Sequence, residues 1–206
     1  MFTGIIKFLG QINLLQQKEN EDLTISILID HYPPIFYSSL IIGCSISCSG
    51  ICLTLIKKSL PFATKVELTF QASEETKNKT TIKNWLIKDK VNIELSLKIG
   101  DEIGGHMVSG HVDEVSQIKN ITKNKDSHIF TFSLPKNVKK FISEKGSVVL
   151  NGVSLTVNEV EKEQFSVNII KHSFESTNFN LLKINDYVNL EIDMIARYIN
   201  KIVNDG

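Results

Sequence analysis

Residues 47–55 read SCSGICLTL and residues 149–157 read VLNGVSLTV, so one short pattern occurs twice in the chain. The second copy repeats a glycine, a leucine and a threonine of the first at the same spacing: Gly50, Leu53 and Thr54 against Gly152, Leu155 and Thr156. A repeat over this separation indicates that the chain contains a duplicated structural unit rather than one continuous domain.

Two further matches stand on either side of this pattern in each half. Thr3-Gly4 and Gln11-Ile12 recur as Ser109-Gly110 and Gln117-Ile118, and the segment 91–94 recurs as 188–191. The three matches lie in the same order, which favours duplication over chance. The predicted halves are residues 1–97 and 98–193, each about the size of a small domain.

Within a half the secondary-structure signals are those of strands. Short segments rich in β-branched residues, at 22–29, 46–56, 65–70 and 90–97, are separated by Gly, Asn or Lys-rich turns. This spacing is typical of a small closed or nearly closed β-barrel. Prolines precede 35–40 and 136–142 at equivalent places, and each of these stretches is expected to form one or two helical turns.

The end of the chain breaks the duplication. Ile195, Tyr198, Ile199 and Ile202 follow the i, i+3, i+4, i+7 spacing of an amphipathic helix, which is expected over 194–206. The apolar stripe of this helix has two interpretations: packing on its own domain, or contact between subunits.

Composition narrows the function classes. The 206 residues are 42% hydrophobic and 22% charged, with 23 basic residues balancing 23 acidic ones. A net charge of zero gives no electrostatic reason to expect nucleic acid or an anionic membrane as a partner. No apolar run is long enough to span a bilayer, the N-terminus does not resemble a signal peptide, and three cysteines are too few for a disulfide scaffold. The expected location is therefore the cytoplasm.

The histidines and cysteines do not predict a metal site. Cys44, Cys48 and Cys52 are four residues apart, which corresponds to roughly 13 Å along a strand. His106 and His111 are five apart in an expected strand and would point to opposite faces. Sequence motifs typical of phosphate-binding loops, dinucleotide sites and zinc proteases are absent.

The two halves differ at positions where related pockets would need different polar groups. Cys52 corresponds to Ser154, Glu75 to His172, and Ile5 to His111. These differences suggest two related pockets with different roles. A neutral exchange of Cys for Ser, and histidines that serve only the structure, are the alternatives.

Four motifs together resemble the riboflavin synthase family: MFTGII at 1–6, SGICLT at 49–54, GGHMVSGHVD at 104–113 and NGVSLTV at 151–157. The resemblance covers essentially the whole chain. It implies a mainly β fold of two tandem six-stranded Greek-key-like barrels plus a C-terminal helix. The N-terminal lumazine-binding barrel would span 1–97, the C-terminal one 98–193, and a trimerisation helix 194–206.

The resemblance also implies the reaction. A four-carbon unit would pass from one molecule of 6,7-dimethyl-8-ribityllumazine to another, giving riboflavin and 5-amino-6-ribitylamino-uracil. This is the last step of riboflavin biosynthesis, and it would need no cofactor or metal. The family implies a homotrimer, with each active site between the first barrel of one subunit and the second barrel of its neighbour. Association with lumazine synthase is a further partner hypothesis.

The resemblance, carried over motif by motif, predicts two substrate pockets. The first would use Gly4, Ile5, Ile6, Cys52, Leu53, Thr54, Gln71, Ala72, Ser73, Glu74, Glu75 and Thr76. The second would use Gly110, His111, Val112, Lys145, Ser154, Leu155, Thr156, Ile169, Ile170, Lys171, His172, Ser173 and Phe174. Further candidates near the pockets are Phe2, Thr3, Ser45 and Asp193.

The predicted catalytic groups are few, because orienting two rings should supply much of the rate. His111 or water is the candidate base, and Cys52, Ser154 or water the candidate nucleophile. One departure from the family pattern is Ser49, where Asn is common and where the second half has Asn151. The competing hypotheses are a non-catalytic lumazine- or flavin-binding antenna protein and, more remotely, a structural or nucleic-acid-binding tandem barrel.

Overall fold

A computed structural model describes residues 1–62 and 64–205 and contains two closed six-stranded antiparallel barrels. The first barrel has the strand order β1-β2-β5-β4-β3-β6, and the second joins β7 to β12 in the equivalent order. The first-barrel strands are β1 Phe8–Gln16, β2 Leu23–Asp30, β3 Ser45–Cys48, β4 Ile51–Lys58, β5 Lys65–Ala72 and β6 Lys90–Leu95. Those of the second are β7 Glu114–Asn124, β8 Ser127–Ser133, β9 Ser147–Leu150, β10 Val153–Val160, β11 Gln164–Ile169 and β12 Tyr187–Ile192. The predicted fold class is confirmed; the exact domain boundaries stay a prediction.

Short helices connect the strands at matching places in the two halves, and a longer one ends the chain. The α-helices are α1 Pro34–Ser39, α2 Glu74–Lys79, α3 Lys171–Ser176 and α4 Met194–Asp205, and the 3-10 helices are η1 Thr81–Asn84, η2 Lys139–Phe141 and η3 Asn178–Leu181. The helical turn predicted after Pro33-Pro34 is confirmed as α1, whereas the stretch after Pro135 forms only the short η2. The last residue of the predicted C-terminal helix, Gly206, lies outside the described residues.

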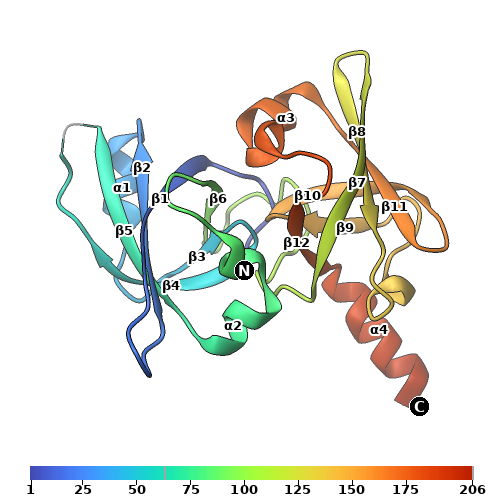
Figure 1. Ribbon diagram of the computed structural model, residues 1–206, viewed down its shortest axis with the longest axis horizontal. Helices are drawn as coiled ribbons and strands as arrows, with labels where there is room; N and C mark the ends of the chain where they lie inside the picture. The colour runs from blue at the N-terminus through green and yellow to red at the C-terminus, as the bar shows by residue number, and fades with distance from the viewer. Residues whose placement is uncertain (63, 206) are drawn as a thin grey trace.

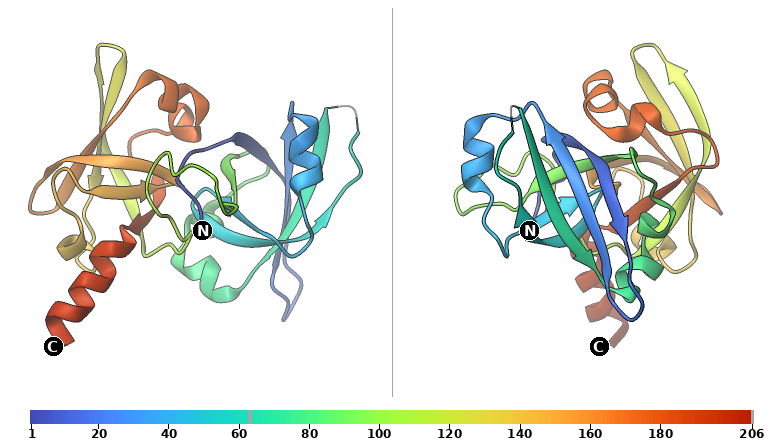
Figure 2. Two further views of the ribbon diagram at one scale, coloured as in Figure 1. Left: turned by 180° about the vertical axis from the view of Figure 1, so that it is seen from behind. Right: turned by 60° about the vertical axis from the view of Figure 1, so that its left-hand side comes forward.

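Each barrel encloses its own hydrophobic core, because alternate residues of every strand point inward. The first core is rich in Ile and Leu, and the second contains four fully buried phenylalanines: Phe130, Phe132, Phe165 and Phe179. The barrels lie side by side, with the N-terminus between them and α4 projecting from the second barrel (Figure 1). The left view of Figure 2 shows the same arrangement from behind, and the right view shows it turned by 60°.

Two sequence-based strand assignments are wrong. The run 46–56 is a hairpin, with β3 and β4 joined at Ser49-Gly50, so Cys48 and Cys52 lie on different strands. Ser49 has φ +46° and Gly50 has φ +82°, so the two residues form a tight turn. The β-branched residues on either side led to the prediction of one continuous strand. The segment 104–111, expected to be a strand, is irregular apart from one bridge between Val108 and Phe2.

Helix α4 leaves an apolar face uncovered. Ile195, Tyr198, Ile199 and Ile202 are between 56% and 73% exposed. Arg197 on the same helix binds both oxygens of the Asp113 carboxylate at 2.8 and 2.9 Å, so the start of α4 is held to the second barrel. Within the described residues, no helix has the length and apolar composition needed to cross a bilayer.

Candidate functional site

Two buried carboxylates, one at the end of each barrel's last strand, hold two loops in place. Glu94 of β6 accepts hydrogen bonds from the Thr3 amide and hydroxyl, both at 2.7 Å, and from the Gly4 amide at 3.0 Å. Glu191 of β12 is its equivalent. It accepts from the Ser109 amide at 2.7 Å and its hydroxyl at 2.6 Å, and from two further amides, Gly110 at 2.9 Å and His111 at 3.1 Å.

The electrostatics of these carboxylates reflect two opposed effects. Burial raises the pKa of Glu94 and of Glu191 above the usual glutamate range, and the hydrogen bonds that each accepts act in the opposite direction. Each carboxylate accepts with both of its oxygens, and protonation would replace one acceptor site with an O–H donor. The loops at 3–4 and 109–111 are therefore held best by charged carboxylates.

Each of these loops reaches into the opposite barrel. The Ser154 amide of β10 donates to the Gly4 carbonyl at 2.9 Å, and the Cys52 amide of β4 donates to the Gly110 carbonyl at 2.8 Å. Ile6 packs on the second core and Val112 on the first. The predicted grouping of 4–6 with 52–54, and of 110–112 with 154–156, is wrong: the chain crosses between barrels before entering the first strand of each half.

Only glycine fits at the two crossing points. Gly4 has φ +76°, and a Cβ there would lie 2.6 Å from the Ser154 Cβ. Gly110 has φ +77°, and a Cβ there would lie 2.8 Å from the Cys52 Cβ. Both positions combine left-handed backbone with close approach to the opposite barrel, which explains a glycine at each.

We call the first composite arrangement the Cys52 site: residues 52–54, 71–76 and 110–112. Strands β4 and β5 are antiparallel with Leu55 opposite Phe70, so the start of β4 lies beside the end of β5. The Ser73 hydroxyl then accepts the Thr76 amide at 3.2 Å and caps α2, so 73–76 form a helix start rather than a strand end. Two members are buried in the barrel, Leu53 and Ala72; Thr54, Gln71, Glu74 and Glu75 are exposed.

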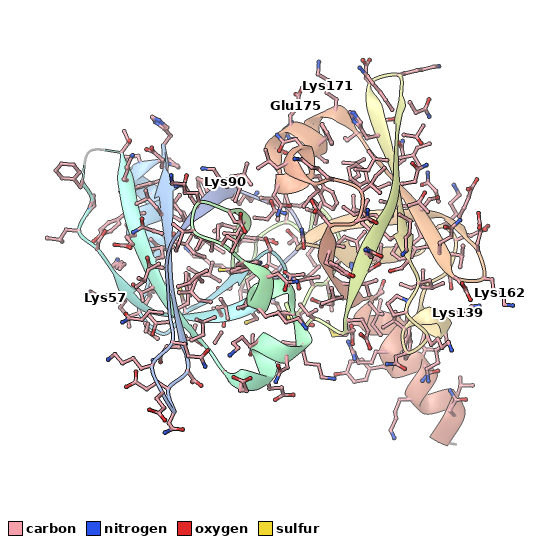
Figure 3. The ribbon with its side chains drawn as sticks, in the orientation of Figure 1. Lys57, Lys90, Lys139, Lys162, Lys171 and Glu175 are labelled. Carbon is pink, nitrogen blue, oxygen red and sulfur yellow. The ribbon has the colours of Figure 1, made fainter. Side chains whose placement is uncertain are left out.

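The Ser154 site is the equivalent arrangement: residues 154–156, 169–174 and 4–6. Val157 lies opposite Val167, which brings the start of β10 beside the end of β11, and α3 follows. A cavity of about 530 Å³ lies between α3 and the tip of the β7–β8 hairpin, lined in part by Ile170, Lys171 and His172. Figure 3 labels Lys171 and Glu175 on α3.

The remaining members of the Ser154 site divide by burial. Leu155 and Ile169 are buried, whereas Thr156 is exposed. The Phe174 ring stacks on His128 at 3.9 Å. Ser173 is half-buried, and its carbonyl accepts the Thr177 hydroxyl at 2.7 Å. Lys145 is exposed, and its amide donates to the carbonyl of Val157 in β10.

His106, which the sequence brought forward only as a possible metal ligand, lies beside Ser154. Its Nδ1 lies 2.7 Å from the Ser154 hydroxyl, while its Nε2 is buried with no hydrogen-bond partner among the described residues. Burial lowers the pKa of His106, with Asp193 acting in the opposite direction, so the ring is neutral near pH 7. Within GGHMVSGH, His106 was weighed only together with His111 as a metal pair, so its contact with Ser154 was not predicted.

Three further predicted residues lie outside the two sites defined above. Phe2 is buried and exchanges two backbone hydrogen bonds with Val108, at 2.7 and 3.0 Å. Ser45 is half-buried opposite Thr54. The Asp193 carboxylate accepts the Ile195 amide at 2.8 Å at the start of α4.

Cys44, Cys48 and Cys52 are all unbridged, and burial raises the pKa of the Cys48 thiol well above its usual range. Among the side chains that the structure describes, no group of three or more His, Cys, Asp or Glu is arranged to hold a metal ion.

Comparison with known proteins identifies a matching family model, related sequences and a similar solved structure. The family model described as "Lumazine binding domain" matches residues 3–96 and 109–193. Riboflavin synthase of Brucella abortus is 40% identical over 202 residues, covering 98% of each chain. Riboflavin synthase of Photobacterium leiognathi is 37% identical over 203 residues, covering 98% of this chain and 89% of that one. A crystal structure of LumP complexed with riboflavin has a TM-score of 0.79 at 24% identity, covering 93% and 99% of the two chains.

Proposed function

This chain belongs to the riboflavin synthase family, whose members are transferases with two lumazine-binding domains, and we propose that it converts two molecules of 6,7-dimethyl-8-ribityllumazine into riboflavin and 5-amino-6-ribitylamino-uracil. The four carbons that leave one lumazine complete the third ring of the other. The reaction is balanced by the two substrates alone, so it requires no external oxidant or reductant.

The chemistry needs a base and a nucleophile. The 7-methyl group of lumazine is acidic because its anion delocalises into the electron-poor ring, and a base removes that proton. A nucleophile adds to the partner ring and opens it for transfer of the four-carbon unit. Holding the two rings in a fixed mutual orientation converts an encounter between two molecules into an intramolecular step.

The observation that carries the proposal is a pair of equivalent sites with unequal chemistry. The Cys52 site has a thiol and the loop of His111, whereas the Ser154 site has a hydroxyl hydrogen-bonded to His106. Donor and acceptor are the same compound, so similar pockets are needed, and they must differ because one substrate loses carbons and the other gains them. A neutral His106 is suited to accept the Ser154 proton and so activate this hydroxyl or a water beside it.

The experiment is incubation of the purified protein with 6,7-dimethyl-8-ribityllumazine alone, with both products quantified. One riboflavin formed for two lumazines consumed supports the proposal. Saturable binding with no riboflavin would favour the antenna alternative, and no binding would contradict both functions.

Replacing Cys52 with serine makes the two sites alike at this position. We expect turnover to fall about tenfold, since a hydroxyl is a weaker nucleophile than a thiol, with a smaller change in lumazine affinity. Steady-state rates and equilibrium titration of the same variant separate the two effects. Cys44→Ser, at a half-buried thiol outside both sites, is the control, and unchanged turnover of Cys52→Ser would reduce Cys52 to a packing residue.

Replacing His106 with asparagine keeps a hydrogen-bonding group near the Nδ1 position but removes a base. We expect turnover to fall at least about tenfold with near-normal ligand affinity, because only proton transfer at Ser154 is impaired. The exposed His31 is a matched control: His31→Asn should retain full turnover. Full activity of His106→Asn would show that the contact with Ser154 is structural only.

The assembly and location are part of the same proposal. The uncovered apolar face of α4 supports self-association. The family resemblance makes a homotrimer the proposed assembly, with the first barrel of one subunit against the second barrel of its neighbour. Three free cysteines are compatible with a cytoplasmic protein. Association with lumazine synthase is tested by co-sedimentation of the two purified proteins.

A further inference from the structure

A second kind of cavity lies where the two barrels meet. It has a volume of about 430 Å³ and is lined by the segments that join η1 to β6 and η3 to β12. Figure 3 shows Lys90, which lines it, in the region between the barrels. None of its described lining residues belongs to the Cys52 or Ser154 site. Small-molecule pockets have volumes of roughly 300–1,000 Å³, so this one accommodates a single ring system with a short chain.

The floor of the cavity is fixed by hydrogen bonds that cross between the halves. The Asn178 amide N–H donates to the Asn92 side-chain oxygen at 2.7 Å, and the Asn92 side-chain nitrogen donates to the Asn178 side-chain oxygen at 3.0 Å. At the equivalent place, the Thr81 amide donates to Asn189 Oδ1 at 2.8 Å. These buried groups satisfy one another, so the floor is rigid and the cavity is preformed.

Two aspartates around the cavity are occupied by the fold itself. Asp89 accepts the Leu86 amide at 2.8 Å, and the equivalent Asp186 accepts the Lys183 amide at 2.7 Å. Each carboxylate closes its own turn, which explains why both halves have an aspartate here. Each turn uses only the Oδ2 atom, so each carboxylate keeps a second oxygen that no described residue binds.

Three other lining positions differ between the halves. The first half has Asn84, Trp85 and Lys88 where the second has Leu181, Leu182 and Asn185. The fold therefore tolerates either set. Among the described residues, the side chains of Asn84, Lys88 and Asn185 have no hydrogen-bond or ion-pair partner. Two amides and one ammonium are thus available to a ligand.

We propose that this cavity binds a pyrimidinedione ring, the ring shared by the substrate and both products of the proposed function, on which the choice of ligand rests. A side-chain amide presents a donor and an acceptor, as does the imide edge of this ring, so Asn84 and Asn185 match it. Lys88 supplies a donor to a ring carbonyl or to a ribityl hydroxyl. Trp85 and Tyr187 supply aromatic surface for the flat faces of the ring.

The chain offers a specific probe of this site, because Trp85 is its single tryptophan and its indole N–H donates to Thr81 on the cavity floor at 3.2 Å. We expect 6-ribitylaminouracil to shift the indole ¹H–¹⁵N signal saturably in the intact protein. Asn84→Leu installs the residue that the second half already has, and should weaken this effect at least about tenfold, the loss of one well-formed polar contact. Asn180→Leu, an exposed position outside the cavity, should leave it unchanged.

The outcomes separate this inference from the proposed function. Riboflavin formation at the wild-type rate in Asn84→Leu, together with a weakened indole shift, supports a site distinct from catalysis. An indole signal that does not move, or that moves equally in Asn84→Leu, overturns the inference even if the protein makes riboflavin. A saturable shift that depends on Asn84, in a protein that makes no riboflavin, supports the cavity while contradicting the proposed reaction.

Discussion

Glu191→Gln is expected to lower riboflavin formation at least about a hundredfold, because a displacement of about 1 Å in a reacting group has an effect of this size. Glu191 accepts hydrogen bonds from Ser109, Gly110 and His111 with both carboxylate oxygens. Glutamine has the same shape but turns an NH2 group toward amides that also donate. The loop that contributes His111 to the Cys52 site would lose its anchor.

Glu94→Gln is the matched variant for the other loop. It should release Thr3 and Gly4 and impair the Ser154 site, with a loss of similar size. The control is Glu163→Gln, at an exposed glutamate in the β10–β11 turn, which should keep full activity. Normal turnover in Glu191→Gln, in protein with wild-type circular dichroism, would contradict a positioning role for this carboxylate.

The same carboxylates predict a pH dependence. Burial raises their pKa, so they take up protons at a higher pH than an ordinary glutamate, for which the pKa is about 4.3. The pKa of these two carboxyl groups is higher in the folded protein than in the unfolded chain, so the folded protein binds the protons more readily. Protonation of Glu94 and Glu191 on acidification therefore does not favour unfolding. Turnover should therefore be lost on acidification before the fold is. Parallel measurement of kcat/KM and circular dichroism against pH checks this order.

The duplicated patterns made the fold predictable because strand periodicity and turn residues are local features. Gly50-x-x-Leu53-Thr54 and its copy defined two barrels, and the spacing of Ile195, Ile199 and Ile202 defined the last helix. The hairpin at Ser49 was missed because a serine at φ +46° has no strong sequence signature. At this position its hydroxyl accepts the Asn92 amide at 3.1 Å, as the Asn151 side chain accepts the Asn189 amide at 2.9 Å, so the departure from the family pattern keeps the turn contact.

The grouping of site residues could not be predicted, because it depends on contacts between distant segments. Sequence repeats place 4–6 with 52–54, yet the Gly4 carbonyl is bound by Ser154, in the opposite barrel. The loops at 3–6 and 109–112 each contact the other half's barrel, and this crossing does not alter the order or spacing of the repeated residues. His106 was missed for a related reason: it lies before the second repeat begins and has no counterpart in the first half, so the comparison of halves could not mark it.

Deleting residues after Asp193 is expected to abolish trimer formation and to lower riboflavin formation at least about a hundredfold, the effect expected when reacting groups are no longer held in position. The deletion removes the apolar face of α4, on which Ile195, Ile199 and Ile202 are exposed. It also removes Arg197, which binds Asp113 two residues beyond His111. The two barrels have separate cores that do not include α4, so they should remain folded.

A second variant separates the two roles of α4. Ile199→Lys with Ile202→Lys keeps Arg197 and its contact with Asp113 but places charges on the apolar face, so an assembly role predicts monomers and the same loss of activity. Arg197→Met keeps the apolar face and breaks only the contact with Asp113, so it should form trimers with a smaller loss. Sedimentation and product assays on the three variants check these outcomes. An intact trimer from the deletion variant would contradict the assembly role of α4. The subunits would then associate without the exposed apolar stripe of this helix.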